Sequence, residues 1–216
     1  MPITKYLEHN AEQFGNDCAL VELNPEVRDT RRMTWKEYDL TQPEPNLPYR
    51  REISWKIFNE KANRCAHYLL ERGVHPGDKV GILMMNCLEW LPIYFGILKT
   101  GALAVPLNFR YASDEIDYCL NLADISVLFF GPEFIGRLEA ISDKIIAHRL
   151  LIYVGEGHEP TFSENYVMSA MNYSSENLNI EISDDDYGAI YFSSGTTGFP
   201  KAILHKHRSL IHSCRV

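Results

Sequence analysis

The residues best suited to chemistry in this 216-residue chain stand together from Ser193 to Lys201, in the sequence SSGTTGFPK. The stretch combines four hydroxyl side chains, two glycines and a lysine. Glycine lets the backbone turn and approach a ligand closely. Successive N–H groups and hydroxyls can surround anionic oxygens, and lysine adds a mobile positive charge. This composition suits the binding of a polyphosphate.

The spacing differs from that of a Walker A loop, which is Gly-x-x-x-x-Gly-Lys-Ser/Thr. Here Phe199 and Pro200 separate Gly198 from Lys201, and the apolar run Ala202–Leu204 that follows predicts a second strand. A helix N-terminus directed at phosphate is therefore not assumed. The alternative is a polar surface hairpin, because Ser, Thr and Gly are common turn residues.

The rest of the chain alternates between two hydrophobic patterns. Apolar runs predict strands at 18–21, 80–85, 103–106, 127–130, 150–154 and 187–192. One-sided apolar spacing predicts helices at 3–14, 55–70, 86–100, 113–123 and 134–141, with a weaker helix at 164–173. In the helix at 86–100, Pro92 predicts a slight kink or a later start. This alternation predicts an α/β fold with a doubly wound, mainly parallel sheet and helices on both faces. Ligands of such sheets bind at the carboxyl ends of strands, and the stretch 193–201 follows the last long apolar run.

Composition narrows the function classes. A net charge of −8 and a pI of about 5.5 argue against a nucleic-acid binder. The five cysteines are scattered without a C-x-x-C pair, which argues against a disulfide framework or a zinc site and indicates a reducing compartment. The start of the chain lacks a signal-peptide core, and no apolar run is long enough for a transmembrane segment. We expect a cytoplasmic protein.

The stretch 193–201 resembles the phosphate loop of the adenylate-forming (AMP-binding) enzymes, which include acyl-CoA synthetases, firefly-luciferase-like enzymes and peptide-synthetase adenylation domains. Other segments resemble further motifs of this family in the same order, over roughly residues 54–212: Ser54–Asn59, Gly77–Val80, Gly96–Ala102, Val105–Asn108 and His207–Leu210. Pro106–Asn108, followed by Glu115–Tyr118, looks like the fatty-acid and aryl-acid CoA ligases, whereas adenylation domains more often have an acidic residue at the position of Asn108.

The resemblance implies a two-step reaction with a carboxylic acid, ATP, Mg²⁺ and CoA. The acid is first converted to an acyl-adenylate with release of pyrophosphate, and a thiol then displaces AMP. It also implies roles within the loop. Lys201 and Thr196 are the expected catalytic residues, Ser193 the expected Mg²⁺ ligand, and the residues expected to hold the phosphates of ATP are Ser193, Ser194, Gly195, Thr196, Thr197, Gly198 and Lys201. Ala202 stands where the family usually has glycine.

The family's large domain extends beyond residue 216, so the resemblance implies that this chain is an N-terminal part that does not complete the reaction alone. We expect residues 1–75 to comprise a helix, an irregular segment at 15–53 and the first long helix, as an incomplete second-sheet subdomain. Residues 76–216 should form an α/β subdomain ending in the phosphate loop. Exposed sheet edges favour association, which leaves homo-oligomer formation open. An amino-acid adenylation domain and a non-catalytic binding module are the alternative functions.

Several polar residues outside the loop have structural explanations. The H-x-H pair His205 and His207 lacks a Cys or acidic ligand at suitable spacing for a metal site, and we expect His207 to support the loop from behind. The acidic run Asp184–Asp186 is expected to be a solvated turn rather than a Mg²⁺ site. No sequence feature places a base beside Cys214, which argues against a nucleophilic thiol.

Two further groups keep alternative interpretations. Trp90, Tyr94 and Phe95 could line a ligand channel, but a helix packed on a sheet also needs such side chains. Asn108 and Arg110 follow a predicted strand and could face the ligand cleft; we assign them no role.

Overall fold

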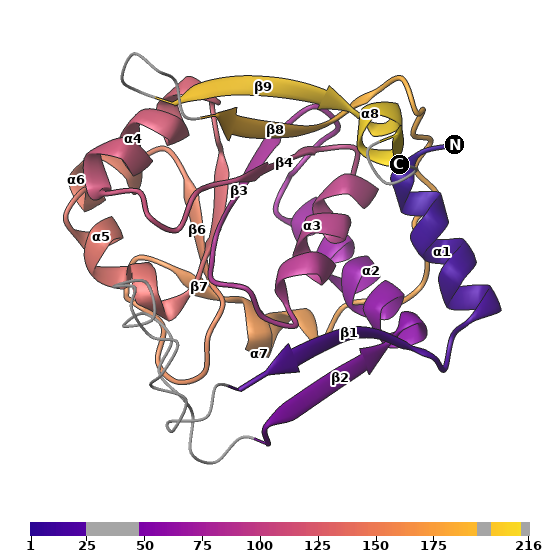
Figure 1. The fold of residues 1–216 in the computed structure, drawn as a ribbon. Helices are drawn as coiled ribbons and strands as arrows, with labels where there is room; N and C mark the ends of the chain where they lie inside the picture. The colour runs from indigo at the N-terminus through magenta and orange to yellow at the C-terminus, as the bar shows by residue number, and fades with distance from the viewer. Residues whose placement is uncertain (25–47, 194–199, 213–216) are drawn as a thin grey trace, which may run out of the picture.

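The structure, a computed structural model, describes residues 1–24, 48–193 and 200–212. Its main feature is a seven-stranded sheet in the order β7-β6-β5-β3-β4-β8-β9 (Figure 1). The strands are β3 (Lys79–Leu83), β4 (Leu103–Pro106), β5 (Val127–Phe130), β6 (Leu150–Tyr153), β7 (Glu164–Asn165), β8 (Tyr187–Ser193) and β9 (Lys201–Lys206). All neighbouring strands are parallel except β8 and β9, which form an antiparallel hairpin. The predicted α/β fold with a mainly parallel sheet is confirmed.

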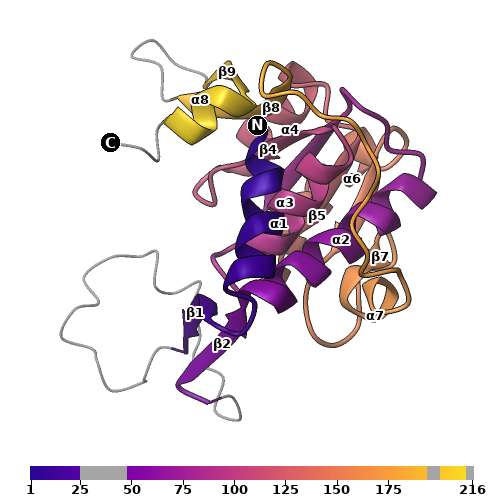
Figure 2. The same ribbon diagram turned by 90° about the vertical axis from the view of Figure 1, so that its right-hand side faces the viewer.

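Helices cover both faces of this sheet, as Figures 1 and 2 show. One group comprises α1 (Ile3–Gln13), α2 (Trp55–Glu71), α3 (Trp90–Lys99) and α7 (Tyr166–Ala170). The other comprises α4 (Ser113–Leu122), a 3₁₀ turn (Pro132–Phe134), α5 (Ile135–Glu139) and α6 (Ser142–Ile145), while α8 (His207–His212) follows β9. Each face of the sheet therefore has its own apolar core.

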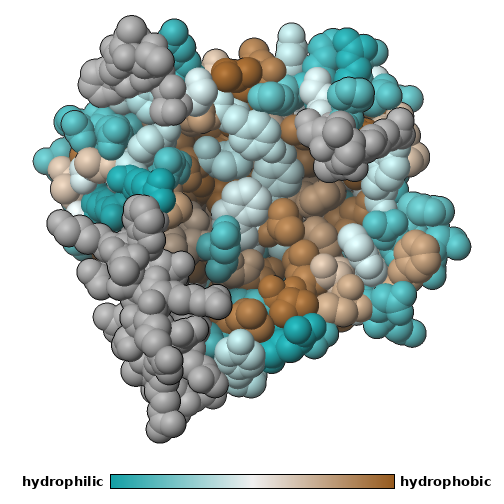
Figure 3. All heavy atoms as spheres, viewed as in Figure 1, coloured by the Kyte–Doolittle hydropathy of each residue, from teal (hydrophilic) through white to brown (hydrophobic). Residues whose placement is uncertain are grey.

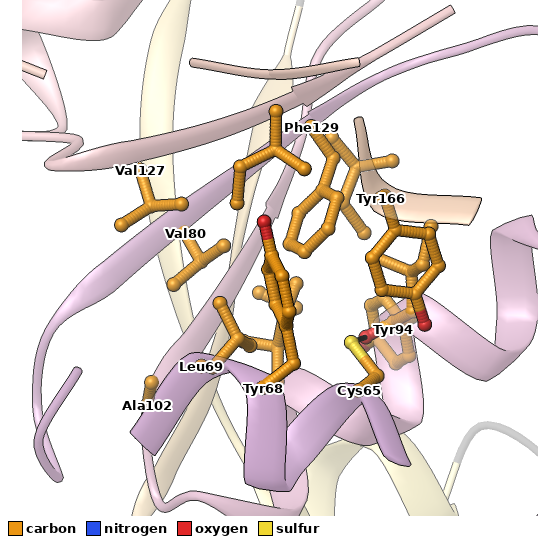
Figure 4. Packing of buried hydrophobic residues seen from close by; sticks show 14 of the residues in the cluster. Cys65, Tyr68, Leu69, Val80, Tyr94, Ala102, Val127, Phe129 and Tyr166 are labelled. Atoms are coloured by element: carbon orange, nitrogen blue, oxygen red, sulfur yellow. Dashed lines mark hydrogen bonds between the residues drawn. The ribbon is translucent and has the colours of Figure 1, made fainter. Parts of the chain in front are cut away.

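The core beneath α2 and α3 is rich in aromatic side chains (Figure 4). Tyr68 extends from α2 toward the sheet and meets the ring of Tyr166 edge-on, with 5.5 Å between ring centroids. Phe129 of β5 contacts the same Tyr166 ring edge-on. The core on the opposite face joins buried residues of α4, α5 and α6 to β5, β6 and β8. The continuous apolar strands are thus explained by burial on both faces.

A close crossing joins α2 to α3. Gly96 of α3 lies against Cys65 and Ala62 of α2, and a Cβ built on Gly96 would lie 2.5 Å from the Cβ of Cys65 and 2.9 Å from the carbonyl oxygen of Ala62. The absence of a side chain at Gly96 therefore allows the two helix backbones to approach closely.

The amino-terminal segment forms a smaller layer beside this crossing. Strands β1 (Cys18–Leu23) and β2 (Arg50–Ser54) form a separate antiparallel pair. Lys99 of α3, which is 3% exposed, pairs with Glu8 of α1 at 3.0 Å and so fixes α1 against α3. We expected residues 15–53 to be irregular, but β1 and most of β2 lie in this segment and form regular strands. Residues 25–47 lie outside the described ranges. The division at residue 75 stays a prediction.

Some predicted boundaries need correction. α3 begins at Trp90, which is the later start that Pro92 predicted; the proline fits the first turn of this helix, and Glu89 is engaged by Lys61 instead of closing a capping box. The predicted helix at 134–141 is shorter than expected: Phe134 ends the 3₁₀ turn, α5 ends at Glu139, and α6 begins beyond the predicted range, at Ser142. The segment 164–173 begins with the short strand β7, which pairs with β6 before α7 starts.

Candidate functional site

The candidate site lies at the end of the β8–β9 hairpin. Ser193 ends β8 and Lys201 begins β9, and these two residues are register partners across the hairpin. Because directly opposed residues of an antiparallel pair lie on the same face, the hydroxyl and the ammonium group flank the loop together. The remaining predicted phosphate-binding residues lie outside the described residues: Ser194, Gly195, Thr196, Thr197 and Gly198.

The two described ends of the loop differ in burial. Ser193 is half-buried and Lys201 is exposed, whereas Pro200, immediately before Lys201, is buried. The proline therefore anchors the returning chain and leaves the lysine in solvent. An exposed ammonium group on a four-carbon stem can reach an anionic ligand over a range of positions.

The segment after β4 follows a strand that neighbours β8 on the same sheet. Asn108 and Arg110 are exposed there, and the side-chain oxygen of Asn108 accepts a hydrogen bond of 3.0 Å from the backbone N–H of Arg110. Arg137 of α5 donates to the carbonyl oxygens of Phe109 and Tyr111 at 2.6 and 3.0 Å, which fixes the segment. The strand order, which was not predictable from the sequence, brings Arg110 to the same edge as Lys201.

A broad cleft opens at this carboxyl edge as well. Its volume is about 660 Å³, and it is lined by residues that follow β3, β5 and β6, including Asn86, Gly131 and Gly155, and by Glu22 and Leu23 of β1. The face drawn in Figure 3 is hollowed near its centre, where hydrophobic side chains show between hydrophilic ones. An edge of this kind is where ligands of open α/β sheets bind.

The aromatic residues of α3 serve packing. The ring of Trp90 stacks on Tyr94 with 5.6 Å between centroids, and Phe95 contacts Phe58 of α2 edge-on. Tyr94 is 5% exposed, and its hydroxyl lies 2.7 Å from the hydroxyl of Tyr191 on β8. Burial raises the pKa of Tyr94, so its hydroxyl stays protonated at neutral pH.

The expectation that His207 supports the loop is wrong. Lys206 pairs with Tyr187 at the start of β8, so His207 lies at the opposite end of the hairpin from the loop. The imidazole is fully buried against Gly188, where a Cβ would lie 3.1 Å from the ring. Burial lowers the pKa of His207, although the charges of Asp186 and Asp184 act in the other direction. The residue thus packs the base of the hairpin as a neutral side chain.

The acidic run 184–186 lies at the same remote end of the hairpin, and two of its carboxylates form ion pairs. Asp184 pairs with the amino group of Met1 at 2.9 Å, and Asp185 pairs with Lys206 and with Arg208. Hydrogen bonding from that amino group, followed by its charge, lowers the pKa of Asp184. These carboxylates therefore fasten the two ends of the described chain together.

Within the described ranges, no three His, Cys, Asp or Glu side chains gather as a metal site would need. The cysteines in the same ranges are free thiols, and burial raises the pKa of Cys65 to about 12 and that of Cys87 to about 11. Neither thiol is therefore activated as a nucleophile. Cys214 lies outside the described residues. Every helix in the described ranges is too short or too polar to span a lipid bilayer.

A comparison with known protein families identifies the class of protein. The chain matches the family model described as "AMP-binding enzyme" over residues 7–216, and it belongs to that family.

Individual relatives are CoA ligases. The chain is 29% identical to a 3-oxocholest-4-en-26-oate–CoA ligase of Rhodococcus rhodochrous over 165 residues, covering 74% of this chain and 29% of the relative. It is 30% identical to the long-chain-fatty-acid–CoA ligase FadD13 of Mycobacterium tuberculosis over 171 residues, covering 79% of this chain and 32% of the relative. The chain thus spans about three tenths of the length of the curated relatives it matches.

Solved structures agree with the fold. The anthranilate CoA ligase AuaEII, in complex with anthranoyl-AMP, superposes with a TM-score of 0.78 at 25% identity, over 96% of this chain and 35% of that one. The N-terminal domain of FACL13 from Mycobacterium tuberculosis superposes with a TM-score of 0.73 at 24% identity, over 95% of this chain and 44% of that one. The fold is therefore that of the N-terminal domain of adenylate-forming enzymes.

Proposed function

We propose that this chain is the phosphate-binding part of an acyl-CoA synthetase, an acid–thiol ligase that uses ATP and Mg²⁺. The observation that carries the proposal is the pairing of Ser193 with Lys201 at the carboxyl edge of the sheet, on either side of a stretch rich in glycine and hydroxyl groups. The names of the relatives support a CoA ligase rather than an amino-acid adenylation domain.

In the proposed reaction an oxygen of the carboxylate attacks the α-phosphorus of ATP. The bond from that phosphorus to the bridging oxygen breaks, and pyrophosphate leaves with the bond's electrons. A thiolate of CoA then attacks the acyl carbon, and AMP departs with the oxygen that joined it to the acyl group. Charge neutralisation of the departing pyrophosphate is the contribution that the described residues can make.

Each residue of the loop has a proposed role. Lys201 neutralises the β- and γ-phosphates, and Thr196 donates its hydroxyl to the same oxygens as the second catalytic residue. Ser194, Gly195, Thr197 and Gly198 supply the remaining phosphate contacts. Ser193 offers one neutral oxygen, and Mg²⁺ takes most of its ligands from water and phosphate, so the half-buried hydroxyl fits as a single ligand beside a polyphosphate.

The chain spans about three tenths of the length of its relatives. We therefore propose that the 216 residues bind the polyphosphate of ATP without completing the ligase reaction alone.

Binding of MgATP to this chain, measured by isothermal titration calorimetry, tests the proposal. K201M removes the charge at the loop, and its matched control is K206M, because Lys206 lies on the same strand at the far end and pairs with Asp185. We expect K201M to weaken MgATP binding about tenfold or more, as loss of a charge-assisted contact does, while K206M binds as the wild type does. Equal affinities of the two variants would count against a phosphate-binding role for Lys201.

A further inference from the structure

The loop-proximal half of β8 is weakly joined to the rest of the sheet. Across the parallel β4–β8 junction, which lies within the described residues, the register joins a single pair, Ala104 with Ala189. By contrast, β3 and β5 are joined over four consecutive pairs. Ser193 lies at the end of β8 beyond this junction.

Pro106 explains why the ladder stops there. The backbone N–H groups of Leu103 and Leu107 donate to Asp78 and Ile82 on the β3 side, at 2.7 and 2.9 Å. Backbone N–H groups of successive residues in a strand point alternately to its two neighbouring strands. Since the N–H groups of positions 103 and 107 point to β3, the backbone at position 106 faces β8. Proline has no N–H to donate. The sheet therefore lacks a backbone donor toward β8 at this level, although the carbonyl group of Pro106 remains an acceptor, and no register pair continues beyond Ala189.

A side-chain bond stands at that level instead. The hydroxyl of Tyr191 lies 2.7 Å from that of Tyr94, which is 5% exposed on α3 and stacked on Trp90. The Tyr191 ring also contacts the ring of His205 on β9, with 5.0 Å between centroids. Figure 4 shows Tyr94 among the buried side chains of this core. Through these two contacts, Tyr191 of β8 is linked both to α3 and to β9.

Tyr191 is well placed to act on the loop. Residues two apart on a strand point to the same face, so Tyr191 and Ser193 share a face of β8. Ile203 opposes Tyr191, and Lys201 opposes Ser193. Fixing the Tyr191 hydroxyl therefore fixes the tilt of the hairpin end that carries Ser193 and Lys201.

We propose that the Tyr94–Tyr191 hydrogen bond is a tether that replaces the interrupted β4–β8 ladder and positions Ser193 and Lys201 for phosphate. Both tyrosines are positioning residues, because they act through the hairpin and not by touching the ligand. The positioning of Ser193 and Lys201 for phosphate rests on the proposed function, whereas the tether between α3 and β8 does not.

Hydrogen–deuterium exchange of the ligand-free chain tests the tether. Y94F and Y191F each remove one hydroxyl, and Y187F is the matched control because Tyr187 is an exposed tyrosine of the same strand. Loss of a hydrogen bond of ordinary strength predicts that the amides of 190–193 and 201–204 exchange about fivefold faster in Y94F and Y191F. The double variant should exchange at least as fast as either single variant, because the Tyr94–Tyr191 bond is absent in all three. Exchange equal to that of the wild type and Y187F overturns the tether.

Titration with Mg²⁺ and inorganic triphosphate tests the positioning role. We expect about fivefold weaker binding in Y94F, Y191F and the double variant, and unchanged binding in Y187F. Global stability measured by urea unfolding separates this effect from general destabilisation, since the affinities are compared where every variant is folded. Faster exchange with unchanged triphosphate affinity overturns the positioning role. If the wild-type chain binds no triphosphate, the proposed function and the positioning role both fall, and the exchange data still decide the tether.

Discussion

Substitution of Gly96 by alanine tests the helix crossing on which the first core depends. The new Cβ would lie 2.5 Å from the Cβ of Cys65, 2.7 Å from its Sγ and 2.9 Å from the carbonyl oxygen of Ala62. Two of these atoms belong to the stiff part of α2, so the helices must separate. Overpacking of this kind costs up to about 3 kcal/mol, and the higher helix propensity of alanine returns about 1 kcal/mol. The expected net loss is about 2 kcal/mol.

Thermal and urea unfolding of G96A measure this loss. For a domain of this size, a loss of about 2 kcal/mol corresponds to a melting temperature lower by about 4–8 °C. The matched control is G136A, because Gly136 lies in helix α5 and a Cβ there would meet no atom within 4 Å. We expect G136A to be neutral or more stable by up to about 1 kcal/mol. A G96A variant as stable as G136A would refute the steric reasoning.

Two pH-dependent stabilities follow from the described side chains. Burial alone would raise the pKa of Glu8, but the hydrogen bonds and charges of Lys5 and Lys99 outweigh it and lower the pKa below 4.5. The carboxylate therefore stabilises the fold above that pH and this stability is lost as the pH falls further, so the urea midpoint should fall more steeply below pH 4.5 in the wild type than in E8Q. Burial lowers the pKa of His207 below 6.5. The unfolded chain then binds the extra proton first, and stability should decrease as the pH falls below 6.5, a slope that H207F should reduce. Parallel pH profiles of wild type and variant would contradict either assignment.

Local pattern predicted the elements that have strong periodicity. The long helix α2 appears where its apolar face and Ser54 predict it, and the hydroxyl of Ser54 accepts the N–H of Ile57. The short strands β2 and β7 escaped prediction, because β2 reads as the charged sequence RREIS and β7 has two residues. Their strand form depends on pairing with other strands, β2 with β1 and β7 with β6, and not on their own residues.

The candidate site shows the same limit. The composition of 193–201 indicates a candidate site, which stays a prediction, but strand order decides which described elements lie beside Ser193 and Lys201. Arg110 lies at the same edge of the sheet as Lys201 because β4, rather than β3, is the neighbour of β8. His207 was misplaced for a related reason, since six residues of β9 carry it from the loop to the far end of the hairpin. Pairing of distant segments is not encoded in any single local pattern.

The position of β8 in the sheet has a consequence for the order of folding. Ala104 and Ala189 meet only after the chain has laid down β5, β6 and β7 on the other side of β3. Closing so long a loop costs entropy before the contact repays it. We expect β3, β4 and β5 to assemble early and the β8–β9 hairpin to dock last. During synthesis, the hairpin that we propose to bind phosphate would then be among the last described elements to take shape, on a sheet already formed.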